Sequence, residues 1–130
     1  AGLFMRKIRL DVFAAEHGLP YGFIHEGMTL QDLFDADISG RDFEHGKPHP
    51  EIFLTAAEEL GQPPGSCFVV EDATSGVQAA KGGGMAALGV ARQHDQALLN
   101  EAGADLVVTS LDDVAIDALG RGTLQRASMA

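Results

Sequence analysis

The chain has 130 residues, with nine Lys and Arg against 19 Asp and Glu, which gives a formal net charge of −10. This acidic balance argues against a nucleic-acid partner or an anionic membrane surface, because both attract Lys and Arg. The length allows one domain, the single cysteine excludes an internal disulfide, and no apolar run approaches the roughly 18 residues of a membrane span. We find no signal peptide and therefore expect a globular domain in the reducing cytoplasm.

In the first third of the chain we predict a helix over residues 3–17, which Gly18 ends, and a short strand or strand entry over residues 35–40. Beyond residue 46, apolar runs and helical periodicities alternate. Strands are expected at 67–70, 85–90 and 106–108, and helices at 50–60, 75–81, 95–102 and 110–119.

This alternation is typical of βαβ units, so we predict an α/β fold: a Rossmann-like, doubly wound parallel sheet with flanking helices. The continuous apolar run at 67–70 is typical of a strand buried on both faces. We expect one domain over 1–119 and a disordered tail over 120–130.

Two adjacent carboxylates, Glu71 and Asp72, directly follow the first of these strands. In an open α/β sheet, ligands bind beyond the carboxyl ends of the strands. Carboxylate oxygens suit Mg²⁺, which takes one or two of them together with phosphate and water. A structural role is the alternative, with Asp72 capping the next helix and Glu71 a solvated strand end.

Lys47 lies in a stiff loop that contains Pro48 and Pro50. Pro48 removes a backbone donor and Pro50 restricts the residue before it, so the loop has little freedom. A rigid loop that carries one cation could clamp a phosphate group. Taken alone, an ordinary exposed lysine ahead of a helix is the more frequent explanation of this pattern.

Taken together and in this order, the two motifs resemble those of the haloacid dehalogenase-like superfamily, in its β-phosphoglucomutase and phosphoglycolate-phosphatase-like branch. The motifs are Gly46-Lys47-Pro48-His49-Pro50-Glu51-Ile52-Phe53 and Val69-Val70-Glu71-Asp72-Ala73-Thr74-Ser75-Gly76-Val77-Gln78-Ala79-Ala80-Lys81. The resemblance identifies residues 1–119 as the C-terminal part of an incomplete core domain of this type. That branch often has Ser after the acidic pair, whereas this chain has Ala73, which removes one hydroxyl near the metal.

The resemblance implies a Mg²⁺-dependent phosphoryl-transfer site. The lysine that matches Lys47 stabilises the nucleophilic aspartate and the transferring phosphoryl group, and the pair that matches Glu71 and Asp72 holds Mg²⁺ directly or through water. Phosphoryl transfer depends mainly on positioning and on electrostatic stabilisation by cations, which fits these residue types. We expect the intact protein to be a phosphatase or a phosphosugar mutase acting on a small phosphorylated metabolite such as a sugar phosphate.

The nucleophile of this family lies in a D-x-D-x-[TV] motif at the end of a buried strand. The chain has one textual match, Asp35-Ala36-Asp37-Ile38-Ser39, which we reject because the preceding residues 30–34 are amphipathic and the match lies too close to Lys47. We therefore expect the nucleophile to precede Ala1, and the chain as given not to turn over substrate alone.

Two other classes of protein share some of these features. A two-component receiver domain is also acidic, α/β and Mg²⁺-binding, but it presents its acidic pair before the phosphorylated aspartate and its Lys-Pro late, which is the opposite of the order found here. A non-catalytic binding or assembly module that keeps the fold stays open, as does the oligomeric state.

Two further residue types have structural interpretations. Cys67 lies in an apolar strand and is expected to be a core residue. The five histidines show no metal-ligand spacing; His45 and His49 are four apart but flank a proline loop. We expect surface histidines, with contact to substrate as the alternative for His45 or His49.

Overall fold

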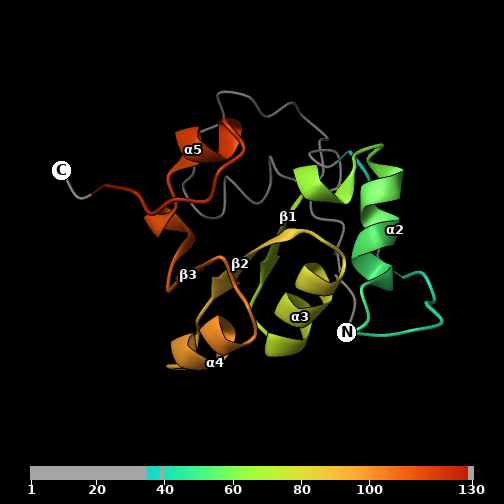
Figure 1. Cartoon of the computed structure of the whole chain (residues 1–130), viewed down its shortest axis with the longest axis horizontal. Helices are drawn as coiled ribbons and strands as arrows, with labels where there is room; N and C mark the ends of the chain where they lie inside the picture. Colours follow the sequence, from blue (N-terminus) through green and yellow to red (C-terminus); the bar gives the residue numbers. More distant parts are fainter. Residues whose placement is uncertain (1–34, 39, 129–130) are drawn as a thin grey trace, which may run out of the picture. The chain divides into compact units, whose positions relative to one another are not determined.

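The structure is a computed structural model that describes residues 35–38 and 40–128 (Figure 1). The chain divides into two compact units, residues 1–42 and 43–130, and every described helix and strand lies in the second. The helix predicted over 3–17 falls outside the described residues. The strand predicted over 35–40 is absent from the residues described there: Asp35 lies in a bend, Gly40 lies in a turn, and residues 36–38 have no regular structure. The positive φ of Gly40, +79°, turns the chain where a strand would extend it.

Three short strands form a parallel sheet in the order β1-β2-β3 (Figure 1). They are β1 (Phe68–Glu71), β2 (Ala86–Val90) and β3 (Leu106–Val108). Val70 pairs with Leu88, and Leu88 pairs with Leu106, so the three strands are in register across the sheet. All three lie within one residue of the positions that the apolar runs predict.

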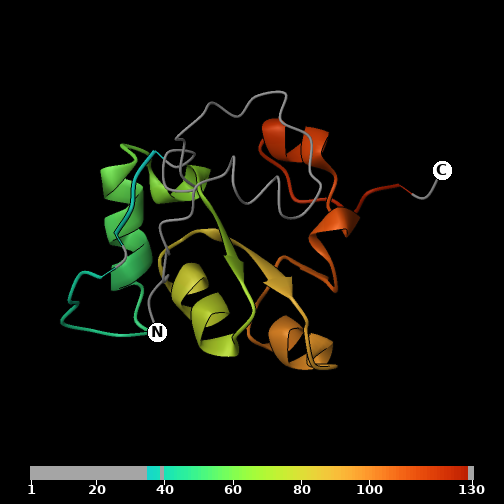
Figure 2. The same cartoon turned by 180° about the vertical axis from the view of Figure 1, so that it is seen from behind.

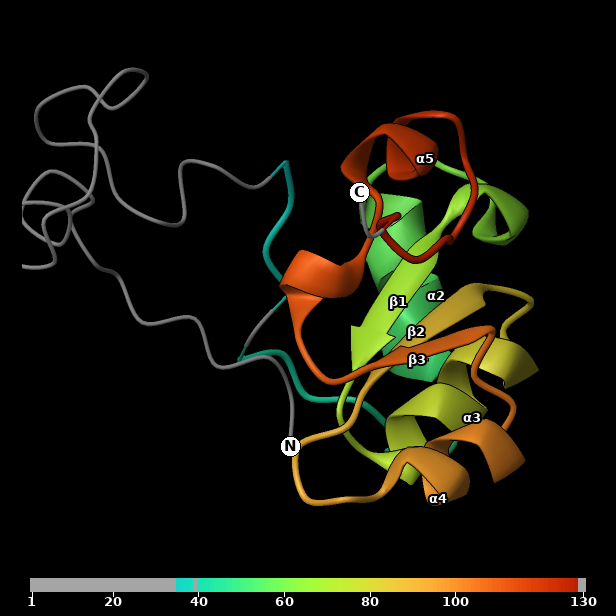
Figure 3. The same ribbon diagram turned by 90° about the vertical axis from the view of Figure 1, so that its left-hand side faces the viewer.

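Helices connect and cover the strands. They are α2 (Glu51–Glu59), α3 (Thr74–Gly82), α4 (Gln96–Glu101) and α5 (Ile116–Gly120), with short 3₁₀ helices η2 (Pro64–Ser66) and η3 (Leu111–Asp113). Parallel strands need crossover connections, which α3 and α4 provide, and both helices pack on the same face of the sheet (Figure 3). Helix α2 lies beside α3 (Figure 2). No helix in the described part of the chain is long and apolar enough to cross a membrane.

Both faces of the sheet are covered along β2 and β3. On one face Gly89 of β2 lies against α4, where an added Cβ would be 3.3 Å from the Cβ of Leu99, so the glycine allows helix and sheet to approach closely. The opposite face carries a cluster of buried apolar residues from β2, β3 and the C-terminal segment. Its members are Leu88, Val108 and Val114, with Val90, Leu106, Leu119 and Leu124 packed against them. The predicted Rossmann-like parallel sheet with flanking helices is therefore confirmed.

The C-terminal segment differs from the single helix predicted over 110–119. It forms η3 and α5, separated at Val114, which is extended and buried. Where we expected a disordered tail, the chain runs back beside Val114: Ala115 N–H donates to Gln125 O at 2.9 Å, and Ala127 N–H donates to Asp113 O at 2.7 Å. Both differences have one cause. The backbone of Val114 is extended and forms an antiparallel β-bridge with Arg126, so the helix is interrupted at Val114 and the C-terminal residues are held beside it.

The first strand is less buried than its apolar run predicts. Within the described sheet, β1 is an edge strand, and Val70 is 55% exposed while Val69 is buried. The prediction of a strand buried on both faces is therefore wrong here, because only the face toward α3 is covered along β1. Cys67 is half-buried just ahead of the strand and outside the core.

Candidate functional site

Lys47 and Glu71 form an ion pair at the carboxyl end of β1. The Nζ of Lys47 lies 2.5 Å from Oε1 of Glu71, and the side chains are only 18% and 11% exposed. The same Nζ lies 5.0 Å from the ring centroid of Phe53 in α2. The ammonium is thus held between a carboxylate and an aromatic face, both of which favour its positive charge.

The loop ahead of α2 places Lys47 there. His49 N–H donates to Gly46 O at 3.0 Å, which closes the loop into a turn around Lys47, and the Lys47–Pro48 peptide bond is cis. Pro50 caps α2 and contacts the end of α3, where a Cβ on Gly83 would lie 3.2 Å from the Cβ of Pro50. The loop and helices α2 and α3 are therefore packed together. This packing places the Lys47 side chain at the carboxyl end of β1.

Glu71 folds back over the first turn of α3. Its Oε2 accepts a hydrogen bond from Ala73 N–H at 3.3 Å. A Cβ on Gly76 would lie 2.0 Å from both Cδ and Oε2 of Glu71, so only glycine leaves room for the carboxylate in this position. Sequence reasoning missed this role of Gly76. The available signal was a glycine inside a helix of small residues, where it costs helix stability relative to alanine.

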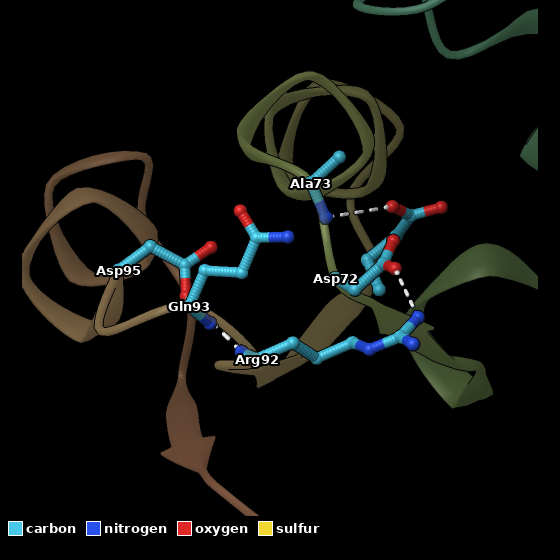
Figure 4. Close-up of polar contacts among 6 residues, drawn as sticks. Asp72, Ala73, Arg92, Gln93 and Asp95 are labelled. Carbon is cyan, nitrogen blue, oxygen red and sulfur yellow. Dashed lines mark hydrogen bonds and ion pairs between the residues drawn. The ribbon is translucent and has the colours of Figure 1, made fainter.

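Asp72, the second carboxylate of the pair, has a different partner. Its Oδ2 accepts from Nη1 of Arg92 at 3.2 Å, and both side chains are largely exposed, at 54% and 71% (Figure 4). Arg92 follows β2, where its N–H and that of Gln93 both donate to Oδ1 of Asp95, at 3.1 and 3.2 Å. Sequence reasoning also missed Arg92, although the carboxyl ends of neighbouring parallel strands meet at the same edge.

A hollow of about 420 Å³ begins at Arg92 and extends past the ends of β2 and β3. It is lined by Ala91, Arg92, His94, Gln96 and Thr109. Arg92, which lines the hollow, also contacts Asp72, although neither Glu71 nor Asp72 is among the lining residues. The end of β1 therefore carries a cation and two carboxylates, and Glu71 and Asp72 are the groups that could hold a hard metal ion.

Comparison with known proteins places this arrangement in a family. The model of the haloacid dehalogenase-like hydrolases matches residues 10–84, which include Lys47, Glu71 and Asp72. The β-phosphoglucomutase of Bacillus subtilis is 40% identical over 92 residues, 71% of this chain and 38% of that protein. The fructose-1-phosphate phosphatase YqaB of Escherichia coli is 43% identical over 63 residues, 48% of this chain and 34% of that protein.

A solved structure agrees with the fold. A haloacid dehalogenase-like protein of unknown function from Agrobacterium tumefaciens superposes with a TM-score of 0.53 at 28% identity, over 87% of this chain and 49% of that one. The chain spans less than half the length of each of these three proteins. The family match over residues 10–84 covers more than half of the chain. The chain belongs to the haloacid dehalogenase-like hydrolase family.

Proposed function

We propose that the intact protein is a Mg²⁺-dependent phosphoryl-transfer enzyme, a phosphatase or a phosphosugar mutase. In this proposal Lys47 is a catalytic residue, and Glu71 and Asp72 hold the metal. The observation that carries it is the 2.5 Å contact of Lys47 with Glu71 at the carboxyl end of a parallel strand, in a chain of this family. Such a contact fixes a cation beside the carboxylates. A fixed cation at this position would stabilise the negative charge of a bound phosphate dianion.

The residues present fit Mg²⁺. Carboxylate oxygens are its preferred protein ligands, and Mg²⁺ usually keeps several waters, so it needs only one or two of them. Asp72 is more than half exposed, so it can exchange Arg92 for a hydrated ion. Glu71 is held by Lys47 and Ala73 N–H, which suits a ligand fixed in advance or one that acts through water. When bound, Mg²⁺ neutralises charge on the phosphoryl oxygens.

Lys47 acts as a positioned point charge. An ammonium has three N–H donors, and its contact with Glu71 uses one of them. The remaining donors can bind oxygens of a phosphoryl group, while Glu71 and Phe53 keep the side chain from moving away. Low exposure strengthens the interaction, because surrounding protein screens charge less than water does.

The nucleophilic aspartate and its acid/base partner belong, in this proposal, to a segment outside these 130 residues. The described residues of the D-x-D match, 35–38, contain no strand, which supports rejecting Asp35 and Asp37 as that motif. The chain alone is therefore proposed to be inactive. A sugar phosphate substrate is supported by the names of the two relatives, one a phosphoglucomutase and one a fructose-1-phosphate phosphatase. A cytoplasmic location stays a prediction.

The test uses the protein encoded by the whole gene. We expect it to hydrolyse p-nitrophenyl phosphate or a sugar phosphate in Mg²⁺ and to lose this activity in EDTA, with recovery when Mg²⁺ is returned. Interconversion of glucose 1-phosphate and glucose 6-phosphate would identify a mutase, and release of inorganic phosphate a phosphatase. A folded protein that binds Mg²⁺ yet turns over none of these substrates would favour the alternative, a non-catalytic binding or assembly module.

A further inference from the structure

Three potential metal ligands surround the loop that carries Lys47. His45, His49 and Glu51 each offer a ligand atom, and these atoms all lie within 4.8 Å of one another. The two imidazole rings are stacked, with centroids 4.4 Å apart and an interplanar angle of 21°. The sequence spacing did not indicate this group, because a turn, and not a helix, brings the two rings together.

The three side chains are already fixed relative to one another by the backbone. His45 N–H donates to Oε2 of Glu51 at 2.7 Å, and Glu51 N–H donates to Nδ1 of His49 at 3.1 Å. The carboxylate is therefore tied to one end of the loop and the His49 ring to the first turn of α2. A ligand set with this much prior order loses little conformational entropy when it binds an ion.

One distance already matches metal coordination. Nδ1 of His45 lies 3.2 Å from Oε2 of Glu51. Two ligands bound 2.0–2.1 Å from Zn²⁺ at tetrahedral angles lie about 3.3 Å apart. An ion can thus replace the proton between these two atoms, the proton passing to solvent. A ring nitrogen of His49 lies within 4.8 Å of both atoms, so a small movement of the ring brings it to the ion.

The kind of metal follows from the ligand types. Two imidazole nitrogens and one carboxylate oxygen suit Zn²⁺ and similar transition metals, whereas Mg²⁺ prefers oxygen ligands alone. The group also lies on an exposed surface, with the His45 side chain 53% and the Glu51 side chain 30% exposed, so a hydrated ion can reach it. The strongly negative chain, at −10, attracts cations in general.

We propose that His45, His49 and Glu51 bind a transition-metal ion of the Zn²⁺ type, at a site separate from Glu71 and Asp72. Three protein ligands leave a further position for water. The ion links the residues on either side of Lys47 and so fixes the loop. This inference does not depend on the proposed phosphoryl transfer, because metal binding by these three residues needs no catalysis.

The experiment is a Zn²⁺ titration of the purified chain in excess Mg²⁺, followed by calorimetry and by a competing chromophoric chelator. We expect one Zn²⁺ per chain, and weakening of its affinity by about tenfold or more in each of His45→Ala, His49→Ala and Glu51→Gln. His94→Ala is the matched control, since His94 is an exposed histidine elsewhere in the described chain, and we expect it to leave the affinity unchanged.

Two further measurements make the result decisive. Circular dichroism of each variant without metal shows whether it is folded, and Co²⁺ replacement gives visible absorption bands whose intensity reports the coordination geometry of the bound ion. Loss of the Co²⁺ spectrum in His45→Ala and His49→Ala, with the fold intact, supports the site. Zn²⁺ affinity that is unchanged in these two variants, or that falls equally in His94→Ala, overturns it.

Discussion

The Lys47 ammonium lies 2.5 Å from the Glu71 carboxylate, although 24 positions separate the two residues in the chain. The pair is mostly shielded from water, so each charge depends on the other. Removal of one partner of a shielded pair leaves an uncompensated charge, which costs more than the pair contributes to stability. The position of the loop against α3 therefore determines whether the carboxylate at the end of β1 has a cation beside it.

Replacement of Lys47 by alanine should nearly abolish turnover by the intact enzyme. The variant removes the cation that faces the transferring phosphoryl group and leaves Glu71 without its partner. Steady-state hydrolysis of p-nitrophenyl phosphate measures the effect. Activity within about threefold of the unchanged enzyme would contradict a catalytic role for Lys47.

Lys81→Ala is the matched control for this variant. Lys81 also pairs with a carboxylate, Asp105, at 2.9 Å, but the pair is half-exposed and lies away from the acidic pair, at the other end of α3. We expect its turnover to stay near that of the unchanged enzyme. Equal loss of activity in both variants would indicate a general effect of removing a lysine from the fold.

Gly76→Ala should displace the Glu71 carboxylate without unfolding α3. The added Cβ would lie 2.0 Å from Oε2 of Glu71, and because this is the end of a flexible side chain, the carboxylate moves and the helix stays. We expect weaker Mg²⁺ affinity and weaker pairing with Lys47. A Mg²⁺ titration, with thermal unfolding beside it, measures the change.

Two variants separate this positional effect from a general one. Gly82→Ala adds a Cβ in the same helix, where its nearest neighbours are ordinary contacts at 3.9 Å, so Mg²⁺ affinity should be unchanged. Glu71→Asp shortens the side chain by one methylene but keeps Cγ, which lies 2.4 Å from the added Cβ, so the double variant with Gly76→Ala should not recover the lost affinity. If Gly76→Ala binds Mg²⁺ as tightly as the unchanged chain, Gly76 does not position Glu71.

The sequence predicted the sheet and the place of Lys47 because both depend on local signals. Apolar runs bounded by glycine and proline mark the strands, and parallel strands direct their carboxyl ends to one edge. The order of the lysine loop and the acidic pair along the chain was then enough to indicate the resemblance to the family. In the structure the Nζ of Lys47 contacts Oε1 of Glu71 at the end of β1.

What the sequence could not predict depends on contacts between segments without periodicity. The Glu71 side chain reaches Gly76 by folding back, and Arg92 reaches Asp72 across the gap between two strand ends. The break at Val114 depends on the return of the chain to pair with it, which no pattern within residues 110–119 indicates. Such positions are decided by tertiary packing, which overrides local preference.

Arg92→Ala should tighten Mg²⁺ binding. The guanidinium competes with the metal for Asp72, and its removal leaves the carboxylate free to take the ion. Because the pair is largely exposed, we expect a gain of about two- to fivefold in affinity. A Mg²⁺ titration at low ionic strength measures it, and high salt should reduce the difference between the two proteins. Weaker binding would show instead that Arg92 holds Asp72 in its metal-binding position.

Asp105→Asn should make the stability of the fold less dependent on pH. Asp105 joins three elements, because Oδ2 accepts from Ala87 N–H at 2.8 Å and from Nζ of Lys81 at 2.9 Å at the entrance to β3. Partial burial raises the pKa of Asp105, but the hydrogen bond from Ala87 and the charge of Lys81 outweigh it, so the pKa lies below its ordinary value.

A lowered pKa in the folded state means that the carboxylate stabilises the fold above its unfolded pKa of about 3.9, and that this contribution is lost as the pH falls through the folded pKa. The unchanged chain should therefore melt at a higher temperature than Asp105→Asn at pH 7, and the two melting temperatures should converge as the pH falls below about 4. Asp117→Asn, which breaks an exposed pair with Arg121, controls for loss of a surface carboxylate. A difference between the unchanged chain and Asp105→Asn that stays constant from neutral to acid pH would show that the charge of Asp105 contributes nothing to stability.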